Sequence, residues 1–538
     1  MTTTRHIHFA VAAAMGISMG ACSTPSGTAA PPDPVPAPAP APAPVVLRAP
    51  MPPANPALPN VPLVTGPLAI NVIYPPAGQT IASRDSNFVF GSVGNGGAGL
   101  TINGILTPVW PNGSFMAWLP NPPQASPQYE IVATTGLETA RLTHPIKLSP
   151  PPPAVPAPAV AVTLISPARW AALIGPAAYA SDTDRVVTGY ALTGGTQRWF
   201  LLPETRVRVI GTRGSDAHVL LDSMQTVRIA QADLRMLDST AVRSLLRASA
   251  MRVVKAAEWT DVVIPVNGPP AYYVENGPAS LTLTLYGTTA TSARQTLPGA
   301  ARSYVQSVTA SRSGPQMKYN LALRGPVYGY QPLWEDGKFT LRVRRPPAVD
   351  SVSPLSGLTI AIDAGHPPAG ATGPTGFKEA DATLPIALKA QELLQAKGVK
   401  VVMTRVLPDA VDLNLRPAIG RRENAHAFVS IHLNAVPDGV NPFRSQGTAT
   451  YHYHPHSAPL AETIQAASVQ HLSLPDNGVK RENFAVVRGT WMPSVLMEGA
   501  FMIMPDQEAA LRTPEYQGRY AQAVVDGLEA YFRTLPAR

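Results

Sequence analysis

The sequence predicts a multidomain protein in which three all-β modules precede one α/β domain with a mostly parallel sheet flanked by helices. Three observations lead to this prediction. Short runs with period-two alternation recur from about residue 66 to 347, which is typical of antiparallel β-structure. From residue 357 onward, strand-like runs alternate with helical segments, which implies parallel strands with helices on both faces. Proline-rich stretches, which can form neither a helix nor a central strand, separate several of these regions.

Composition narrows the class of protein. The chain has 538 residues, of which 60 are proline and one is cysteine. This length predicts several domains, and the prolines predict stiff spacers between them. A hydrophobic fraction of 45% is enough for cores, which excludes a wholly disordered chain. One cysteine excludes a disulfide scaffold and a thiolate-rich zinc site, so a metal must be held by His, Asp or Glu.

The net charge of +8 favours acidic partners such as an anionic wall polymer. The sequence has no run of Lys and Arg and no basic motif interleaved with aromatic residues. We therefore expect no nucleic-acid partner.

Residues 1–22 have the pattern of an export signal. A short polar start precedes an apolar run, Phe9–Met19, which is too short for the roughly 20 residues that span a bilayer. The small residues before Cys22 resemble a bacterial lipoprotein signal, with Met19 where leucine is usual. Ser23, which would be the second residue after cleavage, resembles the residue of outer-membrane lipoproteins rather than an inner-membrane retention signal. The resemblance implies lipidation of Cys22 and a periplasmic lipoprotein of the outer membrane. The alternative is an ordinary secretory signal with an incidental cysteine.

Residues 23–65 form a proline-rich tether, and residues 149–159 form a second proline-rich linker. Proline–alanine alternation favours polyproline II, which rises about 3.1 Å per residue. We interpret the first tract as a semi-rigid arm from the lipid anchor.

The three β modules are placed by their strand spacing and turn residues. Residues 66–148 resemble immunoglobulin-like β-sandwiches of secreted bacterial enzymes, for which a spacer role is favoured over carbohydrate binding. Residues 160–252 predict a small β-barrel-like domain. Residues 253–347 include the alternating run Ser280–Tyr286 and resemble the AMIN-type sandwich that precedes many cell-wall amidases.

The last domain, residues 355–538, shows a regular alternation of elements. We expect strands at 358–362, 399–403, 427–431 and 495–497, and helices at 382–397, 415–425, 459–471 and 514–532. This order is typical of an open α/β sheet.

Metal-competent side chains follow three of these strands. His366, His432 and Glu498 each come directly after a strand-like run. Because the carboxyl ends of parallel strands meet at one edge, we expect these side chains to converge there. Glu379 stands near the start of the following helix and can fold over the same edge.

This set of residues predicts a hydrolytic zinc site. Two histidines and one carboxylate, His366, His432 and Glu379, leave a tetrahedral zinc with one open position. Zinc lowers the pKa of bound water to about 7 and polarises a carbonyl. Glu498 would take the proton of that water and deliver it to the leaving amine. The expected reaction is hydrolysis of an amide.

Beyond these residues, the C-terminal third of the chain resembles the zinc-dependent N-acetylmuramoyl-L-alanine amidase family, type 3. The matching stretches are Ile362–His366, Gly376–Glu379, Val402–Arg405, Leu415–Pro417, Phe428–Ala435, Gly478–Lys480, Phe484–Arg488 and Met492–Glu498. The resemblance implies that His366, Glu379 and His432 bind zinc and that Glu498 is the catalytic carboxylate. It also implies cleavage between N-acetylmuramic acid and L-alanine of the stem peptide, in wall remodelling or daughter-cell separation.

The sequence departs from the family pattern at two loops. Pro367-Pro368 replaces the glycines usual after the first histidine, and Met502–Pro505 replaces a usual Ser-Asn pair. Some family members carry a long helix that plugs the site after the second histidine. The corresponding segment here, 435–447, contains two prolines and an Asp-Gly pair, so we expect no such helix and an open cleft.

Other polar residues are weaker candidates. Asn434, Lys480 and Arg488 are candidate substrate contacts, and a surface role is equally open for Lys480 and Arg488. Three histidines, His452, His454 and His456, have period-two spacing, which on a strand would place them on one face as a metal site or as a polar strand end. The remaining histidines near helices, His426 and His471, are interpreted as surface or packing residues.

Two alternative functions stay open at this point. One is a non-catalytic, lipid-anchored scaffold that binds the wall, and the other is a zinc peptidase that acts within the stem peptide. The expected partners are peptidoglycan and, through the lipid anchor, a membrane; a division-associated activator protein is a further candidate.

Overall fold

A computed structural model describes residues 46–136, 138–150, 161–175, 186–238, 245–290 and 294–537. The chain divides into two compact units, residues 1–44 and 45–538, and everything below concerns the second. The predicted signal peptide with Cys22, the tether up to residue 45 and most of the linker 149–159 lie outside the described residues.

The first module is a β-sandwich, in agreement with the predicted architecture. One antiparallel sheet contains β1 (Asn71–Tyr74), β3 (Ser86–Ser92) and β6 (Ser114–Pro120). The other contains β4 (Gly99–Ile102), β5 (Ile105–Thr107), β7 (Gln128–Thr135) and β8 (Glu138–Pro145). A short pair, β2 (Thr80–Ile81) and β9 (Lys147–Leu148), completes it. Val89 and Phe115 of one sheet pack in the same core as Leu100 and Ile131 of the other.

The second module is one antiparallel sheet with the strand order β12-β11-β15-β14-β13-β10-β16. Its strands are β10 (Thr163–Leu173), β11 (Val187–Tyr190), β12 (Gln197–Leu201), β13 (Arg206–Arg213), β14 (Asp216–Leu220), β15 (Thr226–Ala230) and β16 (Leu234–Met236). Alternate residues from strands at both ends of this order, including Ala171 and Trp199, share one core, so the sheet curls around it.

The third module is a second sandwich with its own core. Its sheets have the orders β18-β19-β27-β26 and β20-β21-β25-β24-β23, and a short parallel pair joins β17 to β22. The strands are β17 (Leu246–Ala248), β18 (Arg252–Lys255), β19 (Trp259–Pro265), β20 (Tyr272–Asn276), β21 (Ser280–Leu285), β22 (Thr288–Ala290), β23 (Arg294–Pro298), β24 (Val305–Ser313), β25 (Gln316–Leu323), β26 (Gly329–Glu335) and β27 (Lys338–Arg344). Leu246 and Ala248 of β17 belong to this core, which therefore begins before residue 253.

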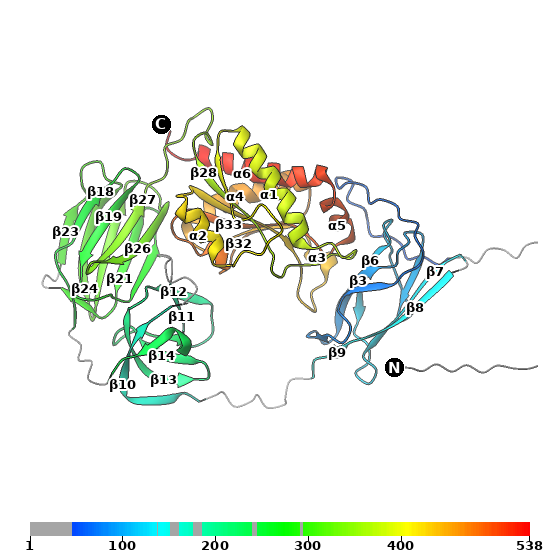
Figure 1. Ribbon diagram of the computed structural model, residues 1–538, viewed down its shortest axis with the longest axis horizontal. Coiled ribbons are helices and arrows are strands. Elements are labelled where there is room, and N and C mark those ends of the chain that lie inside the picture. The colour runs from blue at the N-terminus through cyan, green and yellow to red at the C-terminus, as the bar shows by residue number, and fades with distance from the viewer. Residues whose placement is uncertain are drawn as a thin grey trace, which may run out of the picture. The chain divides into compact units, whose positions relative to one another are not determined.

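The C-terminal domain is α/β, with a six-stranded sheet in the order β29-β28-β30-β33-β31-β32. Its strands are β28 (Thr359–Ala364), β29 (Lys400–Met403), β30 (Ala427–Asn434), β31 (Thr448–His452), β32 (Asp476–Arg481) and β33 (Ser494–Phe501). Every pairing is parallel except that of β31 with β33, so the mostly parallel sheet is confirmed. The helices are α1 (Glu379–Ala396), α2 (Leu415–Arg422), α3 (Pro442–Ser445), α4 (Ala458–Leu472), α5 (Pro505–Leu511) and α6 (Pro514–Arg533). Figure 1 shows this domain in yellow to red.

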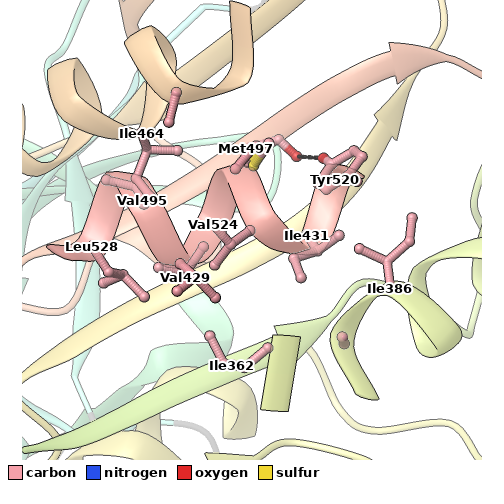
Figure 2. Packing of buried hydrophobic residues seen from close by; sticks show 14 of the residues in the cluster. Ile362, Ile386, Val429, Ile431, Ile464, Val495, Met497, Tyr520, Val524 and Leu528 are labelled. Carbon is pink, nitrogen blue, oxygen red and sulfur yellow. Dashed lines mark hydrogen bonds between the residues drawn. The ribbon is translucent and has the colours of Figure 1, made fainter. Parts of the chain in front are cut away.

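Alternation along the buried strands assigns helices to both faces of the sheet. Ile360 and Ile362 of β28 pack with α1, α4 and α6, whereas Ala361 between them packs with α2 and the turn at Val486. In Figure 2, Ile362 and Val429 point toward Val524 of α6. Each fully buried aliphatic side chain of this kind contributes about 1.5–3 kcal/mol, and the apolar strand runs therefore fix the register of the sheet.

Two predicted strand ends are wrong by several residues. β30 and β33 continue to Asn434 and Phe501, and His432 pairs with Glu498 across the sheet, so both side chains lie within strands rather than after them. The histidine run also differs: only His452 is in a strand, because the strand ends before Pro455. The rings of His454 and His456 stack with centroids 5.4 Å apart.

Part of the predicted tether packs on the folded domains. Leu58 is buried in the core cluster of the C-terminal domain, and the Asn55 side chain donates to the Ser473 carbonyl at 2.8 Å. Arg48 donates to the Gly96 carbonyl of the first sandwich at 2.8 Å. Residues 46–65 are therefore not a free arm. Within the described residues, no helix combines the length and apolarity needed to cross a bilayer.

The third module contacts the edge where the parallel strands begin. Arg344, 1% exposed, donates to the carbonyls of Asn424 and Ala425 at 2.9 and 2.6 Å. Its guanidinium lies 4.8 Å from the centroid of the Trp491 ring. At the same edge, His426 Nδ1 accepts from the Thr359 amide at 3.0 Å, so this ring is held neutral. Burial and then the Arg344 charge lower the pKa of His426 to about 4.

This imidazole makes stability depend on pH. Its pKa is about 4 when folded, against about 6.5 when unfolded, so the unfolded chain binds more protons between these values and stability falls as pH falls. Going from pH 7.5 to 5.0, we expect wild type to lose about 2 kcal/mol more than His426→Asn, which keeps an acceptor but cannot titrate. Urea unfolding at both pH values measures this difference; equal losses in the two proteins would contradict it.

Candidate metal centre

Three predicted ligands converge at one edge of the sheet. His366 follows β28, Glu379 is the first residue of α1 and His432 lies on β30. Their ligand atoms all lie within 4.8 Å of one another. Among the described residues, no other group of His, Cys, Asp and Glu meets the same criterion.

The Glu379 carboxylate is the fixed point of this group. It is buried, and its two oxygens accept from the amides of Leu433 at 2.9 Å and Ala371 at 2.8 Å. Burial alone would raise the pKa of Glu379. Hydrogen bonds from His366 and His432 outweigh burial and hold its pKa well below the usual range, so the carboxylate is ionised.

Each histidine ring is oriented by a second contact. Nδ1 of His366 lies 3.0 Å from the Pro368 carbonyl, which leaves Nε2 3.3 Å from Glu379 Oε2. Nδ1 of His432 lies 3.1 Å from Glu379 Oε1. The Pro368 contact is an outer contact of the kind that sets the tautomer and direction of a metal-binding imidazole, whereas the His432 contact lies within the candidate ligand group.

Two glycines let the backbone pack directly against the histidine rings. A Cβ on Gly365 would lie 2.6 Å from the His432 ring, and one on Gly370, whose φ is +109°, would lie 2.9 Å from His366 Cγ. Two imidazole nitrogens and one carboxylate form a donor set that suits zinc with an open fourth position. The residues present therefore fit the metal predicted from the sequence.

Glu498 is the unpaired acid beside this group. It stands next to His432 in the register of β30 and β33. Its Oε2 atom is buried, and no hydrogen-bond partner for it occurs in the described part of the chain. Burial, and then the charge of Glu379, raise the pKa of Glu498 well above its usual value. A carboxyl group tuned upward in this way can exchange protons near neutral pH.

Tyr520 of α6 fixes the relative position of these two strands. Its hydroxyl donates to the carbonyls of His432 at 2.9 Å and Met497 at 3.1 Å, and accepts from the Gly499 amide at 2.9 Å. These contacts lie where the register of β30 and β33 shifts after His432. Figure 2 shows the Tyr520 hydroxyl pointing at Met497. The phenol therefore positions the strand segments that carry His432 and Glu498.

A buried ion pair lies next to the edge that carries the candidate metal ligands. Asp363, 0% exposed at the end of β28, pairs with Arg416 of α2 at 2.8 Å. The other donors to this carboxylate are the hydroxyls of Thr404 at 2.6 Å and Ser430 at 2.5 Å. Arg416 also donates to the carbonyls of Ala364 and Pro367 at 2.9 and 2.8 Å, and so holds the start of the His366 loop.

Arg405 also holds the loop that carries His366. It donates to the carbonyls of Ala364, Gly365 and Ala380 at 2.9–3.1 Å. It also donates to the Thr383 hydroxyl at 3.1 Å. This guanidinium thus joins the loop that carries His366 to the first turn of α1, which carries Glu379.

A second buried acid holds the loop between the first two ligands. Glu508 of α5, 0% exposed, accepts from the Thr375 hydroxyl at 2.7 Å, its amide at 3.1 Å and the Phe377 amide at 3.3 Å. Burial raises the pKa of Glu508, and the donors at Thr375 oppose that rise. This carboxylate fixes the turn that returns the chain from His366 to Glu379.

The first sandwich packs beside the edge with the candidate metal ligands, on the loop after β30 and on the loop after β33, where Met502–Pro505 departs from the family pattern. Asp438, in the loop after β30, accepts from the Tyr74 hydroxyl, the Ala82 amide at 2.8 Å and the Asn87 side chain at 3.2 Å. One apolar cluster joins the two domains through Phe88, Phe90, Trp110, Met116, Phe501, Ile503 and Met504. The residues in place of Ser-Asn therefore form an interdomain contact. The segment 435–447 holds only the four-residue helix α3, so no long plugging helix occurs there.

The three candidate substrate contacts lie in different places. Asn434 ends β30 and hydrogen bonds to Tyr451, and Lys480 of β32 lies 5.8 Å from the centroid of the same ring. Arg488 precedes β33, at the edge where this strand begins, and bonds to Asn483 at 2.6 Å. The structure thus separates Arg488 from the metal-binding edge.

Several site residues were present in the sequence motifs without an assigned role. Asp363, Arg405 and Arg416 stood in the matching stretches, but buried ion pairing could not be inferred from spacing. Glu508 lies 133 residues from Thr375, and Tyr520 lies 88 residues from His432. A charged residue within an apolar helical face was the one available signal for Glu508.

Comparison with known proteins gives the C-terminal domain its family. Residues 360–530 match the family model described as N-acetylmuramoyl-L-alanine amidase. The probable cell wall amidase LytH of Staphylococcus aureus is 34% identical over 184 residues, which is 34% of this chain and 60% of that protein. The chain thus spans less than two thirds of this curated relative. Residues 360–530 thus form a domain of this amidase family.

Two similar solved structures are of proteins named as amidases. N-acetylmuramoyl-L-alanine amidase AmiC2 of Nostoc punctiforme is 35% identical, with 33% of this chain and 98% of that chain covered and a TM-score of 0.31. The amidase from Clostridium difficile 630 is 31% identical, with 32% and 96% covered and a TM-score of 0.31.

Breaking the buried pair should destabilise the domain strongly. We expect Asp363→Asn to lower the free energy of unfolding by about 3–5 kcal/mol, because it leaves the Arg416 charge buried without a counter-ion. Urea unfolding measures this change. The matched control is Glu423→Gln, which breaks the exposed pair with Lys400 at 2.8 Å and should cost less than about 1 kcal/mol. Similar losses in both variants would contradict the role of Asp363.

Proposed function

We propose that the C-terminal domain is a zinc-dependent peptidoglycan amidase that hydrolyses the amide between N-acetylmuramic acid and L-alanine of the stem peptide. One observation carries the proposal: Glu498, whose buried Oε2 atom has no hydrogen-bond partner among the described residues, stands beside three convergent candidate ligands. The family match of residues 360–530 supports the choice of amide bond and of substrate.

Zinc would be held by His366, Glu379 and His432. When bound, zinc supplies a Lewis acid for the scissile carbonyl and lowers the pKa of water. The ionised state of Glu379 suits this role, because a ligating carboxylate must be deprotonated. The contact of His366 Nδ1 with the Pro368 carbonyl orients this ring in advance, which reduces the reorganisation needed on binding.

Glu498 is proposed to move the proton. Its carboxylate takes a proton from the attacking water as the new C–O bond forms. The resulting carboxylic acid gives the proton to the leaving nitrogen as the C–N bond breaks. The products are the lactyl carboxylic acid on the glycan and the free amine of L-alanine. A raised pKa favours the second transfer, because the protonated form is then accessible near neutral pH.

The other parts of the chain are proposed to place this domain at the wall. A lipid at Cys22 would anchor the chain on the periplasmic side of the outer membrane, and the cell envelope location agrees with the name of the LytH relative. The immunoglobulin-like, barrel-like and AMIN-like modules would act as spacer and wall-holding domains. A division-associated activator protein is a further proposed partner.

Replacing Glu498 should separate chemistry from metal binding. We expect Glu498→Gln to keep the zinc content of wild type and to lower dye release from labelled sacculi by about 10²–10⁴-fold, the usual contribution of general acid–base catalysis. Zinc is measured by elemental analysis of the same samples. The exposed Glu482→Gln is the control and should release dye at the wild-type rate. Wild-type release by Glu498→Gln would refute its role.

The bond that is cut can be read from the products. We expect mass spectrometry of digested sacculi to find released peptides with free L-alanine amino termini, together with peptide-free glycan strands. New termini inside the stem would instead support a zinc peptidase. No released product from zinc-loaded protein would support the non-catalytic scaffold.

A further inference from the structure

A cavity in the described structure lies away from the candidate metal site. It has a volume of about 580 Å³, within the roughly 300–1,000 Å³ usual for ligand pockets. Its walls come from the second module, the third module and the C-terminal domain. The C-terminal wall includes Arg488 and Trp491, which precede β33, whereas Glu498 lies near the other end of that strand. The cavity therefore opens at the edge opposite the metal ligands.

The walls combine aromatic rings with cations. The aromatic residues are Phe200, Tyr272, Tyr273, Tyr330, Tyr453 and Trp491. Arg198 lies 5.3 Å from the ring centroid of Trp199 and 5.4 Å from that of Tyr273, and Arg481 lies 5.5 Å from that of Tyr453. Stacking of this kind holds a guanidinium in place while leaving its edge able to donate.

Three of the cavity arginines lack an acidic partner. Among the described residues, Arg198, Arg481 and Arg488 form no ion pair with a carboxylate. Arg488 is held by Asn483 through Nε at 2.6 Å and Nη2 at 2.9 Å, which leaves Nη1 without a partner. Asn483 is itself held, since it donates to the Gln197 carbonyl at 2.7 Å. This guanidinium is thus preorganised, and its charge is uncompensated.

Two carboxylates, Glu275 and Asp233, also line the cavity, against four arginines in all. Asn276 adds a buried Oδ1 atom that has no hydrogen-bond partner in the part of the chain that the structure describes. The cavity therefore offers many hydrogen-bond donors for the anionic groups of a ligand. It offers fewer acceptors for the ligand's own donors. A ligand that matches this pattern carries several carboxylates and an amine, and is large enough to cover aromatic rings.

We propose that this cavity is a second binding site, for a carboxylate-bearing peptide of the stem-peptide class. The carboxylate class follows from the unpaired arginines, because guanidinium groups pair with carboxylates in a bidentate geometry. The choice of a stem peptide rests on the proposed function, which brings that peptide to the protein. The site would hold one peptide at one edge of the domain while the metal edge remains free for another.

A synthetic stem tripeptide, L-alanyl-γ-D-glutamyl-meso-diaminopimelate, tests the proposal by calorimetry on the full chain. We expect saturable binding that is unchanged by Glu498→Gln. Binding should weaken at least tenfold in Arg198→Ala and Arg488→Ala, because each loses hydrogen bonds to a charged group. The matched control is Arg208→Ala, which removes an exposed arginine stacked at 5.7 Å on Trp170 of the same module, outside the cavity. This control should bind like wild type.

The same peptide with its carboxyl groups amidated should fail to bind. Binding of the amidated peptide, binding that requires added zinc, or equal affinity of Arg198→Ala and wild type would each overturn the proposal. This outcome is independent of the proposed catalysis, which is measured by dye release. Arg198→Ala keeps Glu498 and should therefore still digest sacculi in a zinc-dependent way. Loss of zinc-dependent dye release in wild type would contradict only the proposed function.

Discussion

The metal-binding edge depends on one buried carboxylate. Asp363 is fully buried at the end of β28 and is paired with Arg416, so neither charge can be left alone without a large desolvation penalty. Satisfying this pair fixes α2 against β28 and brings the Arg416 side chain to the carbonyls of Ala364 and Pro367. Arg405 then joins the same loop to the start of α1. Two candidate metal ligands on separate segments, His366 and Glu379, are therefore held in one geometry by polar contacts that are costly to break.

Two carboxyl groups in the same site are driven in opposite directions by their surroundings. Glu379 accepts from two amides and faces two imidazoles, which favours its charged form. Glu498 has the same side chain, but its Oε2 is buried without a partner and lies near the Glu379 charge, which favours its neutral form. A pair of carboxyl groups with separated pKa values is the pattern expected when one binds and the other moves protons. The fold achieves this with adjacent strands, because His432 and Glu498 are direct neighbours in the sheet.

The β modules contact opposite edges of the C-terminal sheet. The first sandwich covers the loops after β30 and β33 through Asp438 and an apolar cluster that includes Ile503 and Met504. The third module contacts the beginning of the strands through Arg344 and Trp491. Ile503 and Met504, which stand where this chain departs from the family pattern, are thus interface residues. The edge with the candidate metal ligands gains a neighbouring domain, and the opposite edge gains a cavity whose lining includes four arginines.

The sequence by itself determined the α/β class of the last domain, most of its elements and the three convergent ligands. These follow from local physics: apolar runs of strand length, helical periodicity, and the rule that parallel strands end at one edge. Only the tertiary structure decided where β30 and β33 end, because their last residues extend by pairing with each other rather than by propensity. It also decided the roles of Glu508, Tyr520 and Arg344, since each acts on a segment distant in the chain. The spacing of His452, His454 and His456 did not give a shared strand face, because the strand ends before Pro455. The rings of His454 and His456 stack on each other instead.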